Sequence, residues 1–217
     1  MSDAFLDKLA ADLKPVKPMR LWALWPMAGI GLVIAALFVI AFYKPRDEMM
    51  AMSHGIMPSN MMVMGKPLLF LVTGLTALWG VGDLVRPQGR LRWRTVVPTI
   101  VLLGWIILSA IGQYMGDGPA STMHSLQGGN QLCYETIMGG GAIGFALLWG
   151  VWLRKAATSA PVALGAMSGL ATASLMAAAY AIHCSMDSPA YLLLVYGVAV
   201  GLITAVTAMA GNKLFKW

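Results

Sequence analysis

Hydrophobic residues along the chain form six long runs with few charges, separated by short polar segments. The runs cover residues 21–43, 67–85, 95–115, 136–153, 160–182 and 190–210. Each is within the ~17–25 residues that a helix needs to cross a bilayer. The runs are continuous and do not alternate with the period of two that is typical of barrel strands. The pattern therefore predicts an all-α polytopic membrane protein, built as a bundle of six transmembrane helices.

The composition supports a membrane protein and argues against an enzyme. Of the 217 residues, 59% are hydrophobic and only 11% are charged, whereas a soluble domain has about a quarter charged residues. The polar segments are too short to bury a core of their own. No GxSxG, HExxH or P-loop pattern occurs, and no cleavable signal peptide is recognisable. We expect no catalytic domain, only a tail over residues 1–20 and a six-helix domain over residues 21–217.

The positively charged residues predict the orientation of this domain. Twelve of them fall on one side of the predicted topology: Lys8, Lys14, Lys17, Arg20, Arg86, Arg90, Arg92, Arg94, Arg154, Lys155, Lys213 and Lys216. The other side has Lys44, Arg46 and Lys66. Since short cytoplasmic loops are enriched in Lys and Arg, both termini should be cytoplasmic. This bias accounts for the net charge of +6 without any direct contact with nucleic acid.

The predicted outer face consists of three loops, over residues 44–66, 116–135 and 183–189. The first of these loops carries His54 and seven closely spaced methionines, Met49, Met50, Met52, Met57, Met61, Met62 and Met64. Thioether ligands favour Cu(I), so the loop is a candidate copper site. Methionine is also a flexible apolar residue, and the alternative is an amphipathic segment that rests on the membrane.

Both cysteines also fall on the outer face. Cys133 precedes the fourth run and Cys184 follows the fifth, so the two should lie at similar depth. Three interpretations remain open: a structural disulfide, a thiol–disulfide redox switch, or a metal site. A metal site could add ligands from the neighbouring loops, namely His183, Met186, His124 and Met123.

The N-terminal tail has the pattern of a short amphipathic helix. Its apolar stripe consists of Phe5, Leu6, Leu9 and Leu13, with the i, i+4, i+8 spacing of one helix face. Helices that lie on membranes normally carry Lys and Arg on the polar face. This tail instead carries Asp7 and Asp12, with Lys8 alone as a basic residue among them. The charge favours a protein partner in a helix-in-groove contact, the alternative being a helix on the membrane surface.

Several segments resemble the NrsF-like family of membrane anti-sigma factors, typified by the negative regulator of the sigma factor SigF. They are the tail LDKLAADLKPVKPMR, the segment HCSMDSPAYLLLVYG, the terminal KLFKW, and the two cysteines. The resemblance implies a bacterial inner-membrane protein whose cytoplasmic tail sequesters an extracytoplasmic-function sigma factor. It also implies that the outer face senses a stress, often a heavy metal, and that the sigma factor is then released to RNA polymerase.

Combined with the soft ligands, the resemblance predicts an anti-sigma factor that responds to copper, another soft metal or redox stress. No cofactor is required, and the metal would be the signal; besides the sigma factor, only membrane lipid is expected as a partner. An alternative function is copper binding or transport by a membrane protein with a methionine-rich periplasmic loop. The methionines in the predicted spans show no continuous stripe, which disfavours a copper conduit.

Overall fold

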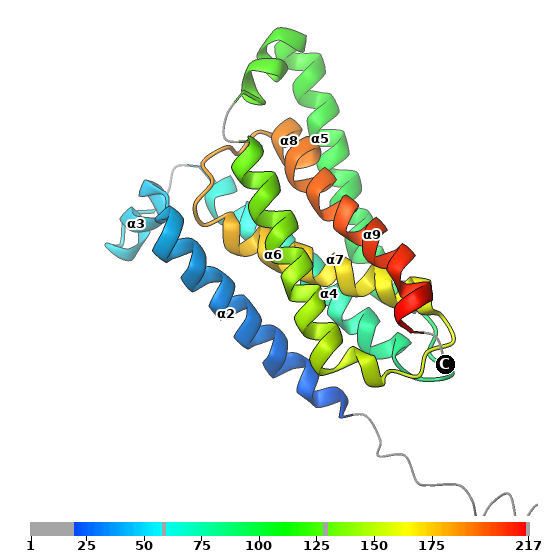
Figure 1. Cartoon of the computed structure of the whole chain (residues 1–217). Coiled ribbons are helices and arrows are strands. Elements are labelled where there is room, and N and C mark those ends of the chain that lie inside the picture. The colour runs from blue at the N-terminus through cyan, green and yellow to red at the C-terminus, as the bar shows by residue number, and fades with distance from the viewer. Residues whose placement is uncertain (1–19, 58–59, 128–129, 216–217) are drawn as a thin grey trace, which may run out of the picture.

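The computed structural model describes residues 20–57, 60–127 and 130–215, and the regular structure in these ranges is entirely helical. Six helices are long and apolar enough to cross a membrane, which confirms the predicted bundle (Figure 1). They are η1 (Leu21–Ala23) continued by α2 (Leu24–Tyr43), α4 (Met62–Leu84), α5 (Trp93–Ser125), α6 (Asn130–Val151), α7 (Pro161–Tyr180), and a composite of α8 (Pro189–Tyr191), the π-helical η3 (Leu192–Gly197) and α9 (Val198–Leu214). The tail residues Phe5, Leu6, Asp7, Leu9, Asp12 and Leu13 lie outside the described residues.

Helix α7 forms the centre of the bundle and packs against α4, α6 and α9. Its contact with α9 is close because Gly165 and Gly169 face Thr207, where a Cβ on either glycine would overlap with Thr207. Small residues of this kind let helix backbones approach each other in membranes. The glycines Gly197 and Gly201 have the same spacing but make no such contact, since a Cβ at Gly201 would meet nothing within 4 Å.

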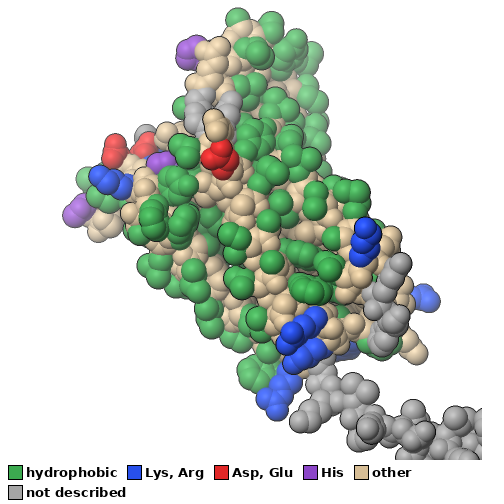
Figure 2. Space-filling view, viewed as in Figure 1, with side chains coloured by type: hydrophobic (Ala, Val, Ile, Leu, Met, Phe, Trp, Pro, Cys, Tyr) green, Lys and Arg blue, Asp and Glu red, His purple; other side chains and the backbone are tan. Residues whose placement is uncertain are grey.

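The surface of the bundle is apolar around its middle. Helix α2 at the edge exposes Ile30, Val33, Ile34 and Leu37, and hydrophobic side chains cover the central belt in Figure 2. A soluble protein rarely exposes so large a continuous apolar surface. This distribution is the one expected where lipid tails surround the helices.

The two ends of the bundle differ in chemistry. One end, here called the basic end, carries the described residues Arg20, Arg86, Arg90, Arg92, Arg94, Arg154, Lys155 and Lys213. The opposite end, here called the thiol end, carries Cys133 and Cys184. Most of the Lys and Arg side chains visible in Figure 2 gather at the basic end, and the acidic and histidine side chains at the thiol end. The beginning of α2 and the end of α9 lie together at the basic end, where Leu24 and Phe215 belong to one buried cluster.

Two of the predicted outer loops contain more helix than expected. The 44–66 segment includes α3 (Asp47–Ser53) and the first turn of α4. Asp47 and Glu48 in the first turn of α3 are favourable for the helix dipole, a signal that the abundance of loop-forming residues obscured. The 116–135 segment includes the end of α5, which kinks at Gly118 (φ 79°) and continues to Ser125, and the start of α6. The 183–189 segment lies between α7, which ends at Tyr180, and α8, which begins at Pro189.

Candidate functional site: a buried thiol pocket

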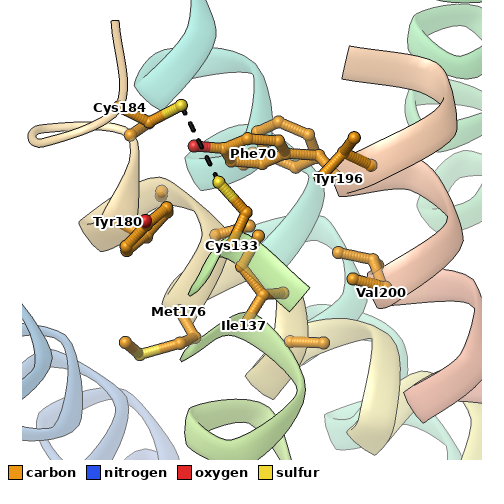
Figure 3. Close-up of a cluster of buried hydrophobic side chains, with 14 of the residues drawn as sticks. Phe70, Cys133, Ile137, Met176, Tyr180, Cys184, Tyr196 and Val200 are labelled. Carbon is orange, nitrogen blue, oxygen red and sulfur yellow. Dashed lines mark hydrogen bonds between the residues drawn. The ribbon is translucent and has the colours of Figure 1, made fainter. Parts of the chain in front are cut away.

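The two cysteines meet at the thiol end of the bundle. Cys133 lies in the first turn of α6, and Cys184 lies in the connection after α7. The Cys133 thiol donates to Cys184 Sγ at 4.0 Å, and both cysteines are free and buried. Figure 3 shows the two side chains pointing toward each other inside a hydrophobic cluster. The prediction that the cysteines lie at similar depth agrees with this placement.

Tyrosine side chains enclose the thiols. The hydroxyl of Tyr191 shares a hydrogen bond of 2.9 Å with Cys133 Sγ. Tyr180 and Tyr196 are buried in the same cluster, and the Tyr196 ring stacks on Phe70 with 5.1 Å between ring centroids. The π-helical segment η3 begins directly after Tyr191 and contains Tyr196. π-Helical segments are frequent at functional sites, and this one places Tyr196 on the pocket.

A buried lysine contacts the connection that holds Cys184. Lys66, in the second turn of α4, has no exposed surface. Its Nζ donates to the carbonyl oxygens of Cys184 at 3.0 Å and Met186 at 2.8 Å, and lies 3.6 Å from Asp187 Oδ1. The ammonium also lies 4.7 Å from the centre of the Tyr196 ring. A buried charge needs partners of this kind to offset its loss of hydration.

A second buried cation joins this connection to the end of α2. Arg46 follows α2 and forms two hydrogen bonds to Asp187, from Nη1 at 3.0 Å and Nη2 at 2.8 Å. It also donates to Cys184 O at 3.3 Å and pairs with Glu48 at 3.1 Å. Asn60 donates to Asp187 Oδ2 at 3.1 Å. We call Arg46, Lys66 and Asp187 the clamp, because together they fix the Cys184 connection to α2 and α4.

The electrostatics of the pocket favour a thiolate at Cys184. This residue lies outside the spans, and the hydrogen bond from Cys133 together with the charge of Lys66 lowers its pKa, although burial acts in the opposite direction. The hydrogen bond to Asp187 raises the pKa of Arg46 above its ordinary value, so the clamp keeps this positive charge at every physiological pH. A thiolate is the reactive form of cysteine in both oxidation and metal binding.

The other predicted metal ligands lie outside the pocket or form hydrogen bonds with neighbouring residues. The Nδ1–H of His183 donates to the carbonyl of Lys44 at 2.9 Å, while its ring packs on Tyr43 and Tyr180. The carbonyl of Met186 accepts from Lys66. His54, His124 and Met123 are exposed. Among the residues that the structure describes, no three His, Cys, Asp or Glu side chains form a group that could hold a metal ion.

The methionines of the 44–66 segment are spread over three kinds of structure. Three lie on the short helix α3, one lies in the connection that follows, and three lie at the start of α4: Met49, Met50, Met52, then Met57, then Met61, Met62, Met64. Met57 and Met61 are the most exposed of the large hydrophobic residues in the described chain. The segment thus keeps accessible thioethers at the same end as the thiol pocket.

The sequence interpretation did not include the clamp or the tyrosines. Lys66 and Arg46 were counted only as rare positive charges of the outer face. The sequence did contain a signal for Lys66, which directly precedes the apolar run 67–85. If the helix begins before this run, the lysine lies within the helix and needs a partner for its charge. Asp187, three residues after Cys184, is the only acidic residue of the 183–189 turn and therefore its natural partner.

The fold and the site together define a polytopic membrane protein with a buried, charge-clamped thiol pocket at one end. A family model described as "Negative regulator of sigma F" (NrsF) matches residues 9–217, and the chain belongs to this family. Over 223 residues it is 27% identical to "Anti-sigma-F factor NrsF" of Caulobacter vibrioides, with 100% of this chain and 99% of that relative covered. No solved structure matches the chain.

Proposed function

We propose that this negative regulator sequesters an extracytoplasmic-function sigma factor at the cytoplasmic face and releases it when its outer face meets redox or soft-metal stress. The observation that carries the proposal is a buried pair of free thiols at the end of the bundle opposite to the start of α2. The excess of Lys and Arg at the basic end favours a cytoplasmic location for that end, which leaves the thiols facing the periplasm.

Oxidation of the pocket would change its geometry. The Cys133 thiol and the Cys184 thiolate would together lose two electrons to an external oxidant and one proton, from Cys133, and form a disulfide bond of about 2 Å. The sulfur atoms are now 4.0 Å apart, so the Cys184 connection would have to move relative to α6. A soft metal such as Cu(I) or cadmium would instead take both sulfurs as thiolates, which removes the hydrogen that Cys133 donates to Cys184.

The clamp offers a route from the pocket to the opposite face. Asp187 follows Cys184 by three residues and binds Arg46, and Arg46 follows the end of α2. Helix α2 in turn leads back to the tail through Arg20. A ligand or an oxidation event that favours one packing of α2 shifts the population toward that packing. The shift is set by the difference in free energy that the ligand or the oxidation makes between the two packings. The exposed methionines would collect Cu(I) near the pocket, so their removal should mainly weaken the response to copper.

The docking role of the tail is tested by co-purification with the cognate sigma factor. Leu9→Asp and Leu13→Asp each place a charge in the apolar stripe, where binding would have to desolvate it, and both should abolish retention. Ala11→Asp is the matched control, because the sequence pattern predicts this position on the opposite face from the apolar stripe. Unchanged retention in both stripe variants would instead assign the tail to the membrane surface.

The orientation is tested with reporter fusions that are active only in the periplasm. A fusion after Trp217 should be silent, and a fusion at Ser59 should be active. The reverse pattern would place the thiol pocket in the cytoplasm and contradict the proposed function.

A further inference from the structure

A groove opens between α2 and α6 in the half of the bundle next to the basic end. It has a volume of about 390 Å³, and Leu175 and Met176 of α7 are among its lining residues. Pockets that hold small molecules have volumes of roughly 300–1,000 Å³. Of the described residues that line the groove, only Thr172 has a polar side chain, and its hydroxyl donates to Ser168 O. The chemistry of the groove therefore suits a hydrocarbon chain.

Small residues line both walls of the groove. Gly31 and Ala35 line it from α2, and Gly140 and Gly144 from α6. A Cβ added to Gly31 would meet nothing within 4 Å, so the protein itself does not close the groove there. Unfilled apolar space forfeits dispersion contacts, and an occupant from the surrounding bilayer would restore them.

The length of the groove corresponds to one leaflet. It extends along α6 from Gly140 to Val151, a rise of about 16 Å at about 1.5 Å per residue. Half of the hydrocarbon core of a bilayer is about 15 Å. The groove therefore reaches from the middle of the membrane to the basic end, as one acyl chain does.

Positive charge surrounds the end of the groove at the membrane surface. Val151 is followed by η2 (Leu153–Lys155), in which Arg154 and Lys155 are exposed. Arg20 lies beside this turn, because Trp152 Nε1 donates to its carbonyl oxygen at 3.3 Å. Within the described part of the chain, none of these three cations forms an ion pair with a carboxylate. Basic pockets next to membrane helices bind anionic lipid head groups.

We propose that the groove is a binding site for an anionic phospholipid, with one acyl chain between α2 and α6 and the phosphate against Arg20, Arg154 and Lys155. A second copy of this chain is a poorer occupant, because parallel copies would bring like charges together at the basic end. The bound lipid would support α2 along the part of its length where the protein leaves a gap.

The proposal is tested by native mass spectrometry of the full-length protein with phosphatidylglycerol and phosphatidylcholine of identical acyl chains. Phosphatidylglycerol should bind more tightly. In the double variant Arg154→Gln/Lys155→Gln, the preference for phosphatidylglycerol over phosphatidylcholine should fall about fivefold for each charge removed. Each basic residue near an anionic head group contributes about 1 kcal/mol. Both residues are exposed, so this variant tests the head-group contact without disturbing the core.

Gly31→Leu tests the groove itself, because the new side chain would occupy it. Binding of both lipids should fall, whereas Gly29→Leu on the same helix should bind as the wild type does, since Gly29 does not line the groove and a Cβ there also meets nothing within 4 Å. Equal binding of the two lipids, unaffected by either the charge variant or Gly31→Leu, would overturn the proposal. A homodimer that Gly31→Leu disrupts without changing lipid binding would overturn it in favour of a second copy.

Discussion

Helices α7 and α2 are both apolar and of similar length, yet they differ in how much of their surface is packed against the rest of the protein. In their most apolar windows, 72% of the residues of α7 are buried, compared with 11% for α2. Helix α7 packs against three neighbours along its length. Helix α2 packs on α7 less extensively and has polar contacts at its ends. Tyr43 shares a hydrogen bond of 3.0 Å with Thr136 at the thiol end, and Trp152 donates to the carbonyl of Arg20 at the basic end. Between these ends lies the groove.

This difference indicates which part of the bundle is able to move. Interiors with close backbone contacts resist deformation because they are packed to high density, so α7 and α9 should behave as one rigid unit. A helix held by polar contacts at its two ends can tilt or shift when one of these contacts changes. Helix α2 also connects the clamp to the tail, and it is therefore the element through which the thiol pocket would act.

The largest expected effect comes from breaking the attachment of α2 at the thiol end. Arg46→Met removes the two hydrogen bonds that Arg46 donates to Asp187. It should cost about 3 kcal/mol, near the lower bound for breaking a buried ion pair, because Lys66 stays within 3.6 Å of Asp187 and Asn60 still donates to it. The measurement is the free energy of unfolding in detergent. Lys44→Met is the matched control, since Lys44 is an exposed cation of the same connection. Equal stability of the two variants would show that the clamp does not hold α2.

A smaller loss of stability is expected when the contact between α7 and α9 is overpacked. Gly165→Ala places a Cβ against the carbonyl of Thr207, and overpacking of this kind costs about 1–3 kcal/mol. Gly29→Ala on α2 is the corresponding change in open space and should stabilise the helix by about 0.5–1 kcal/mol. Thermal denaturation of the two variants gives the comparison directly. If Gly29→Ala destabilised the protein as much as Gly165→Ala does, α2 would be as tightly packed as α7.

The smallest expected effect is on thiol reactivity. Because the Cys133 hydrogen bond and the Lys66 charge lower the pKa of Cys184, a small thiol reagent should begin to modify Cys184 at a lower pH than an unperturbed cysteine, whose pKa is about 8.5. Cys133→Ala removes the larger of the two causes, so the pH profile should move upward. Mass spectrometry of alkylated peptides measures both profiles. A profile that Cys133→Ala does not shift would rule out this electrostatic coupling.

The sequence was sufficient to predict the six spans, because apolar runs of bilayer length with so few charges are typical of membrane-spanning helices. It was also sufficient to place Cys133 and Cys184 at one end, since the alternation of spans determines which connections share an end. The clamp could not be predicted in the same way. The burial of Lys66 depends on where α4 begins, and the pairing of Arg46 with Asp187 joins residues that are far apart in sequence.

The helical content of the segments 44–66 and 116–135 shows a second limit of the sequence pattern. Met49–Met52 lie on α3 and Thr122–Ser125 on the last turn of α5, in stretches where Gly, Pro and Ser suggested loops. A single glycine at φ 79°, Gly118, absorbs the change of direction in α5, and the helix then continues. Local turn residues indicate where a chain can bend, but tertiary contacts decide whether the helix ends there.

The central claim is that the state of the thiol pocket controls how tightly the tail binds its sigma factor. The most direct measurement is the fraction of the cognate sigma factor that stays bound to the full-length protein in lipid nanodiscs, before and after treatment with a thiol oxidant or cadmium. Wild-type protein should release the sigma factor after treatment, and Cys133→Ala/Cys184→Ala should bind it without responding. Release from the double variant at the wild-type level, with both agents, would contradict the claim.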